Sequence, residues 1–194
     1  MTGGESFITV VSGLPRSGTS LMLQMLEAGG LPVLVDTERP ADVHNPRGYF
    51  EYAAVRALGR DASWICEARG RAIKVIHLLL CALPVEHSYR VILMRRDPLE
   101  VVASQTAMLG GDPPGAPSRE RLAEIFSAQL DEVVDWLSGR PEFELLQVDF
   151  GDAVERPREV AVGVCGFLDR DLDVKAMAAA VDRSLHRQQG EGSV

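Results

Sequence analysis

The stretch Gly13-Leu-Pro-Arg-Ser-Gly-Thr-Ser20, GLPRSGTS, decides the fold of this 194-residue chain. It matches the phosphate-loop pattern G-x-x-x-x-G-K-[ST] at Gly13, Gly18 and Ser20, but Thr19 stands where the pattern has lysine. The nearest positive charge has moved to Arg16. A glycine loop before a helix still binds anions through its backbone N–H groups and the helix dipole. The stretch therefore predicts an anion site; the alternative is a plain strand-to-helix turn in which a hydroxyl of the loop caps the helix.

Short apolar runs alternate with helical patterns along the rest of the chain. The run before the loop is β-branched and has no polar alternation, which is typical of a strand covered on both faces. Strands are predicted at 7–12, 72–76, 90–94 and 143–148, and helices after the loop up to 29, from near 51, from 98, at 118–137 and at 177–187. This alternation predicts an α/β protein, a three-layer α/β/α fold with a central, mostly parallel sheet.

Length and charge limit the classes of function. The length predicts a single domain spanning residues 1–194, with residues 188–194 as a flexible tail. A formal net charge of −8 argues against a broad nucleic-acid-binding face. The three cysteines are far apart and lack the spacing of a disulfide framework or a zinc site. The chain starts without a signal-peptide pattern, and its longest apolar stretch, residues 75–83, is shorter than the roughly 20 residues of a membrane span, so we expect a cytoplasmic protein with no membrane partner.

The loop resembles the 5′-phosphosulfate loop of the sulfotransferases, P-[KR]-S-G-T-[ST] after the first strand. Its Pro-Arg form is closest to the tyrosylprotein sulfotransferases and to small bacterial sulfotransferase-like proteins. In that superfamily an arginine at a strand end and a serine eight positions later hold the donor's 3′-phosphate. Arg96 and Ser104 have this spacing, and Asp97 and Pro98 between them are typical of a helix start. The carboxyl edge of a parallel sheet is also where such folds bind ligands.

The resemblance implies a P-loop nucleoside-triphosphate-hydrolase-like fold and a specific donor, 3′-phosphoadenosine-5′-phosphosulfate (PAPS). A sulfuryl group would pass to a hydroxyl or amine of a small-molecule acceptor, leaving adenosine 3′,5′-bisphosphate (PAP), with no metal required. Arg16, Ser17, Gly18, Thr19 and Ser20 would bind the phosphosulfate, with Arg16 stabilising charge. The Arg-Lys-Gly stretch with which the steroid and phenol enzymes grip adenosine is absent. Two C-terminal arginines, Arg183 and Arg187, either replace it or are ordinary surface charges.

The general base that accepts the acceptor's proton has several candidates. Glu51 is the first choice, because a carboxylate entering a helix there could face the cleft. His77, just after a predicted strand, is the second, although it lies one residue further on than the base histidine of the steroid and phenol enzymes. Asp36 and Glu38 lie where the tyrosylprotein enzymes have their glutamate. Lys74 either neutralises the transferring group or pairs with a carboxylate.

Two other functions fit parts of the pattern. A P-loop kinase of a nucleoside or small molecule would use Asp149, at a strand end, to hold magnesium, although Asp149 could equally begin a turn. The missing loop lysine argues against this kinase. A nucleotide-binding protein without catalysis is the third candidate. The acceptor and the oligomeric state are left open by the sequence.

Overall fold

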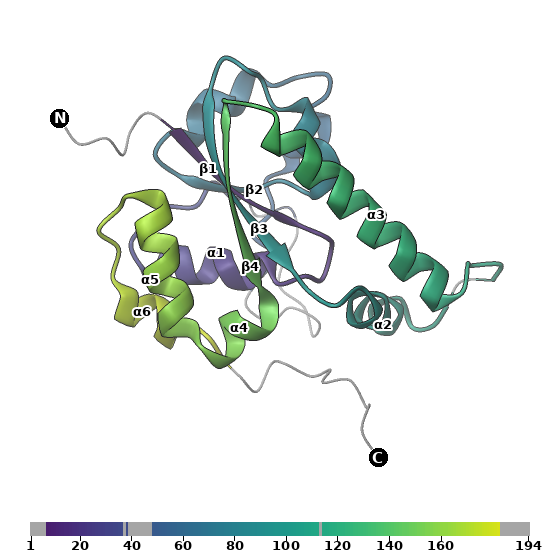
Figure 1. Ribbon diagram of the computed structural model, residues 1–194. Coiled ribbons are helices and arrows are strands. Elements are labelled where there is room, and N and C mark those ends of the chain that lie inside the picture. The colour runs from purple at the N-terminus through teal and green to yellow at the C-terminus, as the bar shows by residue number, and fades with distance from the viewer. Residues whose placement is uncertain (1–6, 37, 39–47, 113, 183–194) are drawn as a thin grey trace.

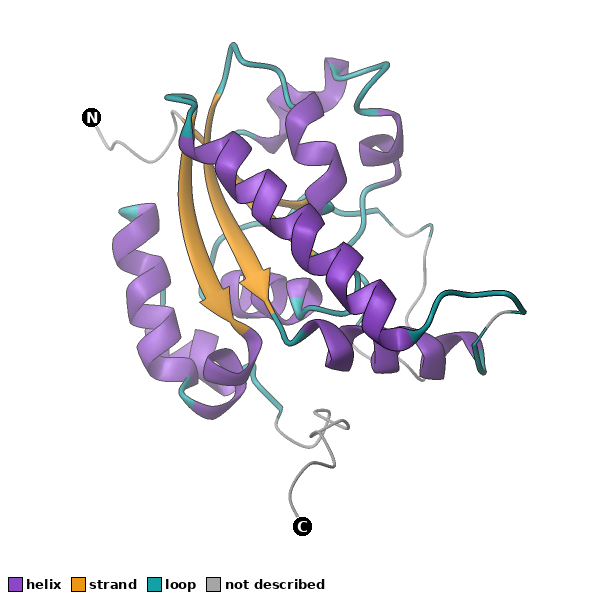
Figure 2. Cartoon of the chain, turned by 45° about the vertical axis from the view of Figure 1, so that its right-hand side comes forward, coloured by secondary structure: helices purple, strands orange, loops and turns teal. Residues whose placement is uncertain are grey.

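The chain forms a four-stranded, wholly parallel sheet with helices on both faces (Figures 1 and 2). The computed structural model describes residues 7–36, 38, 48–112 and 114–182. The strand order is β2-β1-β3-β4. The strands are β1 (Phe7–Gly13), β2 (Ala72–Lys74), β3 (Ser88–Arg95) and β4 (Phe143–Asp149). Every residue of β1 is buried, as its uninterrupted apolar run predicts for a central parallel strand.

The helices form one layer on each face of this sheet, so the predicted three-layer α/β/α fold is confirmed. One apolar core lies between the sheet and α1, α5 and α6. A second core lies between the other face and the C-terminal part of α3 with three short 3₁₀ helices. The bounds are α1 (Thr19–Ala28), η2 (Ala53–Ala57), η3 (Ser63–Ala68), η4 (His77–Ala82), α2 (Pro98–Leu109), α3 (Arg119–Ser138), α4 (Phe150–Glu155), α5 (Pro157–Leu168) and α6 (Val174–Ala179).

Alternate residues of each strand face the two cores, which is why the apolar runs are continuous. Val11 and Ile92 lie in the core beside α1, and their neighbours Val10 and Val91 lie in the core beside α3. Successive side chains of a strand point to opposite faces, so a strand covered on both faces needs no polar alternation.

Three predicted boundaries were wrong. The helix expected from near Glu51 is two short 3₁₀ helices, because Gly59 and a turn at Asp61 interrupt it; the Asp61 carboxylate accepts the backbone N–H of Ser63 at 2.9 Å. The strand expected at 72–76 ends at Lys74, and His77 begins η4. The helix expected at 177–187 is α6, which ends at Ala179, and the segment from 183 lies outside the described residues.

The carboxyl ends of the strands meet at one edge of the sheet, from which the glycine loop departs. Gly13 at the end of β1 pairs with Met94 of β3, and Arg95 pairs with Asp149 at the end of β4. The loop, the start of α2 and the start of α4 therefore converge at this edge. Within the described part of the chain, none of the helices has both the length and the apolar character that crossing a membrane requires.

Candidate functional site

The loop of residues 13–20 leads into α1 without a side-chain cap. Gly18 is the N-cap of α1, and no side chain caps the helix, so the alternative of a capping Ser17 or Thr19 is wrong. Helix geometry gives the N–H groups of the first turn no acceptor within the helix. Three residues of the loop have a positive φ: Gly13 with φ 150°, Gly18 with φ 98° and the non-glycine Arg16 with φ 75°. The left-handed conformation is costly for arginine, so surrounding contacts must hold the loop in shape.

The two glycines are required by close packing. A Cβ on Gly13 would lie 2.4 Å from Ser17 Oγ and 2.8 Å from the carbonyl oxygen of Met94. A Cβ on Gly18 would lie 2.4 Å from Cδ2 of Phe150, at the start of α4. The Ser17 side chain is buried beneath the loop, and its hydroxyl has no hydrogen-bond partner among the described residues. A buried, unpartnered hydroxyl beside a close-packed glycine loop fits an anionic ligand group.

Arg16 and Ser104, predicted from two separate motifs, are in direct contact. Arg16 Nε donates to Ser104 Oγ at 3.0 Å, although the two residues lie 88 positions apart. Ser104 is 7% exposed and belongs to α2. The next residue of α2, Gln105, donates from Nε2 to the carbonyl oxygen of Pro15 at 3.2 Å. Helix α2 therefore contacts the loop at two places and positions the Arg16 guanidinium.

Arg96, the first residue after β3, lies against the back of the loop. Its Nη1 donates to the carbonyl oxygen of Arg16 at 3.1 Å, and its Nε donates to Glu100 Oε2 at 2.9 Å. Its guanidinium carbon lies 4.6 Å from the centre of the Phe150 ring. The side chain is 8% exposed. Asp97 and Pro98 form the predicted helix start, with the Asp97 carboxylate accepting the N–H groups of Leu99 and Glu100.

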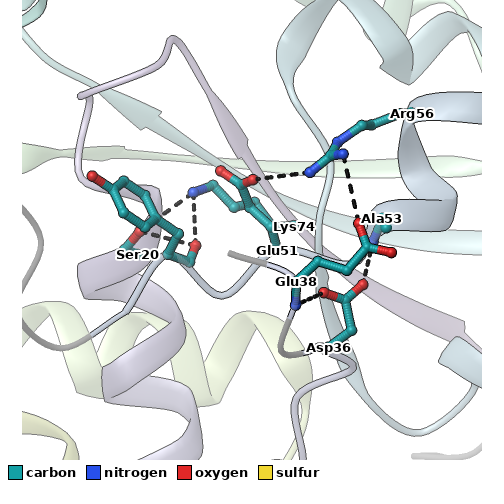
Figure 3. A network of polar contacts seen from close by, with 8 residues as sticks. Ser20, Asp36, Glu38, Glu51, Ala53, Arg56 and Lys74 are labelled. Atoms are coloured by element: carbon teal, nitrogen blue, oxygen red, sulfur yellow. Dashed lines mark hydrogen bonds and ion pairs between the residues drawn. The ribbon is translucent and has the colours of Figure 1, made fainter. Parts of the chain in front are cut away.

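Lys74 contributes a second positive charge to the loop. Its Nζ donates to Ser20 Oγ at 3.3 Å and to the carbonyl oxygen of Tyr49 at 2.9 Å, and Ser20 Oγ donates to the same carbonyl at 3.2 Å (Figure 3). Thr19, at the position of the missing lysine, is 6% exposed. The end of β2 therefore brings a lysine to a loop in which Thr19 stands at the usual lysine position.

The carboxylates proposed as bases lie in one network around Arg56 and η2 (Figure 3). Glu51 Oε2 is 3.9 Å from Arg56 Nη2, and the Glu51 side chain is 28% exposed. Glu38 pairs with the same arginine at 3.7 Å, with 60% of its side chain exposed. Asp36 accepts the backbone N–H groups of Ala53 and Glu38, and these hydrogen bonds lower the pKa of its carboxyl. A lowered pKa makes Asp36 a weaker base.

The side chains of His77 and Asp149 both form hydrogen-bond contacts within the protein. His77 is 3% exposed, and its Nε2 lies 3.1 Å from Oε1 of Gln129 on α3. Its Nδ1 is buried and has no partner within the described ranges. The Asp149 carboxylate accepts the N–H of Asp152 at 3.2 Å and so caps α4. Among the residues that the structure describes, no group of three or more His, Cys, Asp or Glu side chains is placed to hold a metal ion. Arg183 and Arg187 lie outside the described residues.

Four contributors to the site were not singled out from the sequence: Tyr49, Glu100, Gln105 and Phe150. Glu100 and Gln105 carry a weak signal, since they lie on the helix that follows Arg96. Tyr49 acts through its backbone carbonyl and Phe150 through packing on Gly18, and neither contact has a sequence signature.

The family and structure comparisons agree with each other. A family model described as "Sulfotransferase domain" matches residues 8–188. The solved sulfotransferase domain of the Synechococcus PCC 7002 olefin synthase superposes with a TM-score of 0.59 at 16% identity, covering 96% of this chain and 89% of that one. A sulfotransferase domain from the curacin biosynthetic pathway gives 0.56 at 17% identity, covering 96% and 93%. A mouse sulfotransferase complexed with PAP gives 0.51 at 17% identity, covering 93% and 64%. The search of curated proteins found no match.

Proposed function

Because this chain belongs to the sulfotransferase domain family, we propose that it transfers a sulfuryl group from PAPS to a hydroxyl or amine of a small-molecule acceptor. The predicted fold and family are confirmed, whereas the donor, the acceptor and the roles of individual residues are proposals. The observation that carries the proposal is the contact of Arg16 with Ser104, since it joins the residues predicted for the two phosphate groups of one donor.

The residues at the sheet edge fit a phosphosulfate. The first-turn N–H groups of α1, the buried Ser17 hydroxyl and the Arg16 guanidinium all belong to one loop. When bound, PAPS supplies a sulfuryl group joined to phosphate through an anhydride oxygen, and that S–O bond breaks as the acceptor's oxygen or nitrogen bonds to sulfur.

Arg16 and Lys74 would stabilise the negative charge that develops during transfer. An arginine is permanently charged and binds two oxygens with its planar fork, but it cannot act as an acid at neutral pH. Lys74 already lies beside Ser20, at the end of the loop where the phosphate-loop pattern places a hydroxyl. Positioning and charge stabilisation of this kind account for most of the catalysis in the analogous phosphoryl transfers.

Glu51 is the proposed general base. It is partly exposed, so an acceptor can reach its carboxylate, and the nearby Tyr49 carbonyl binds Lys74 beside the loop. The His77 ring is almost fully buried and one of its nitrogens contacts Gln129, so an acceptor can reach it only after a rearrangement. Glu38 is more exposed than Glu51, and Asp36 uses its carboxylate to bind two backbone N–H groups.

Thermal unfolding with nucleotides tests the donor. PAP at about a hundred times its dissociation constant should stabilise the protein by roughly 2.7 kcal/mol, which raises Tm by about 5–10 °C in a chain of this length. ATP and GTP, each with and without magnesium, are the competing ligands. A shift with a magnesium triphosphate and not with PAP would contradict the proposal and favour the kinase, with Asp149 at the metal.

Transfer of labelled sulfate from PAPS to a panel of alcohols, phenols and amines then tests catalysis. Labelled product from one class of acceptor would support the sulfotransferase. PAP binding without transfer to any member of a broad panel would favour the non-catalytic nucleotide-binding protein. The cytoplasmic location stays a prediction.

A further inference from the structure

We propose that Gln105 is a positioning residue of the donor site, which holds the turn at residues 14–17 in the conformation that binds the donor. Its side chain would act through the backbone of the loop and would not touch the donor itself. This role rests on the proposed function for its ligand, PAP. The conformation of the turn can be measured without any ligand, so the two proposals can fail separately.

Residues 14–17 form a β-turn whose third residue is an arginine. The backbone N–H of Ser17 donates to the carbonyl oxygen of Leu14 at 3.1 Å and so closes the turn. The proline ring holds the φ of Pro15 at about −65°, whereas Arg16 has a φ of 75°. A negative φ followed by a positive φ defines a type II turn, in which glycine is the preferred third residue. The turn therefore holds Arg16 in a strained backbone conformation.

Gln105 holds the central peptide of this turn. Its Nε2 donates to the carbonyl oxygen of Pro15 at 3.2 Å, although the two residues lie 90 positions apart. The peptide between Pro15 and Arg16 is trans, so its C=O and N–H point in opposite directions. The N–H of Arg16 therefore points away from Gln105. The preceding residue of α2, Ser104, accepts from Nε of Arg16 at 3.0 Å, so consecutive residues of α2 contact both the backbone and the side chain at this point of the loop.

A type I turn is the alternative conformation for the same four residues. The two types differ by a flip of the central peptide, and the flip would give Arg16 a negative φ and release its strain. It would also put the Pro15 carbonyl oxygen where the Arg16 N–H now lies, and an oxygen in place of an N–H repels an anion. The Gln105 hydrogen bond forms only while that carbonyl faces α2. It therefore offsets the strain and favours the conformation with the N–H toward the donor.

A double-mutant cycle on the affinity for PAP tests this role. Gln105→Met keeps the length of the side chain and removes its donor, and Gln105→Ala is a second variant without the donor. Arg16→Gly and Arg16→Ala both remove the guanidinium, but only glycine relieves the strain of the positive φ. Calorimetry measures the wild type, the single variants and the double variants. Gln147→Met, at an exposed position of β4, is the matched control.

A positioning role predicts a loss that depends on residue 16. Gln105→Met should weaken PAP binding by about fivefold in the wild type and in Arg16→Ala, because the flipped turn becomes populated. In Arg16→Gly the same substitution should change the affinity by less than about twofold, since glycine keeps the positive φ without strain. Gln147→Met should leave the affinity unchanged. Equal losses in all three backgrounds would make Gln105 a direct ligand of the donor and overturn the proposal, as would an unchanged affinity in Gln105→Met.

NMR of the ligand-free proteins measures the turn itself. The Hα of Pro15 lies close to the N–H of Arg16 in a type II turn and further from it in a type I turn, because the ψ of Pro15 changes from about 120° to about −30°. The nuclear Overhauser effect between these two hydrogens should be strong in the wild type and in Gln147→Met, and weaker in Gln105→Met and Gln105→Ala. An equally strong effect in the Gln105 variants would overturn the positioning role. A wild-type protein that does not bind PAP would contradict the donor assignment, and the NMR result would still decide the role of Gln105.

Discussion

Gly18 offers the sharpest test of how the loop is built, because the structure gives two separate costs for a single methyl group. Its backbone is left-handed, and an added Cβ would lie 2.4 Å from Cδ2 and 3.1 Å from Cε2 of Phe150. Forcing alanine into the left-handed region costs about 1 kcal/mol. Overpacking against a ring adds about 1–3 kcal/mol. Gly18→Ala should therefore lower the free energy of unfolding by about 3 kcal/mol, or Tm by about 6–12 °C.

Gly70 is the matched control for Gly18→Ala. It also has a positive φ, 70°, but an added Cβ there has no heavy atom within 4 Å in the described structure. Gly70→Ala should carry the backbone cost alone, about 1 kcal/mol and about 2–4 °C. In a Phe150→Ala background, the further cost of Gly18→Ala should fall to the same value. Thermal unfolding measures these four variants and the wild type, and equal Tm losses for Gly18→Ala and Gly70→Ala would refute the packing argument.

Three further predictions concern the site. Arg16→Ala should reduce the rate of sulfuryl transfer by about a hundredfold or more, as removal of one stabiliser of developing charge does. The control is Arg121→Ala, at an exposed arginine of α3. An unchanged rate in Arg16→Ala would contradict the role proposed for Arg16. Glu51→Gln should abolish most of the turnover, whereas His77→Asn should change Tm more than turnover; the reverse result would make His77 the base. Asp36→Asn should destabilise the protein at neutral pH, because the lowered pKa of Asp36 means that its ionised form is stabilised in the folded state.

The sign of the pH dependence follows from that lowered pKa. A carboxyl whose folded-state pKa lies below its ordinary value, 3.8 for Asp36, contributes stability above that pH and loses it as the pH falls further through the folded pKa. The stability difference between the wild type and Asp36→Asn should therefore be full near pH 6 and shrink below about pH 4. Chemical unfolding at several pH values measures it, and a difference that grows on acidification would contradict the hydrogen bonds assigned to Asp36.

The fold, and the sheet edge from which the glycine loop departs, could be predicted from the sequence because both depend on local signals. A continuous apolar run is sufficient to mark a parallel strand that is buried on both faces, and two glycines at fixed spacing mark a loop with backbone conformations that glycine adopts most readily. The order of strands and helices then gives the layers, and the carboxyl ends of the strands give the edge at which the site lies. These signals were enough to predict that Arg16, Arg96 and Ser104 lie at the same edge of the sheet, where they are in contact.

Which atoms meet at that edge was decided only by the tertiary structure. The contacts of Arg96 with Arg16, Ser104 with Arg16 and Lys74 with Ser20 join residues 80, 88 and 54 positions apart. Such contacts depend on strand register and on how each helix packs, which no local pattern encodes. The burial of His77 against α3 has the same origin, since a histidine after a strand has the same sequence whether it faces a cleft or a helix. The sequence by itself therefore determined the glycine loop and the sheet edge from which it departs, and packing across the sheet determined which side chains contact this loop and which stay exposed.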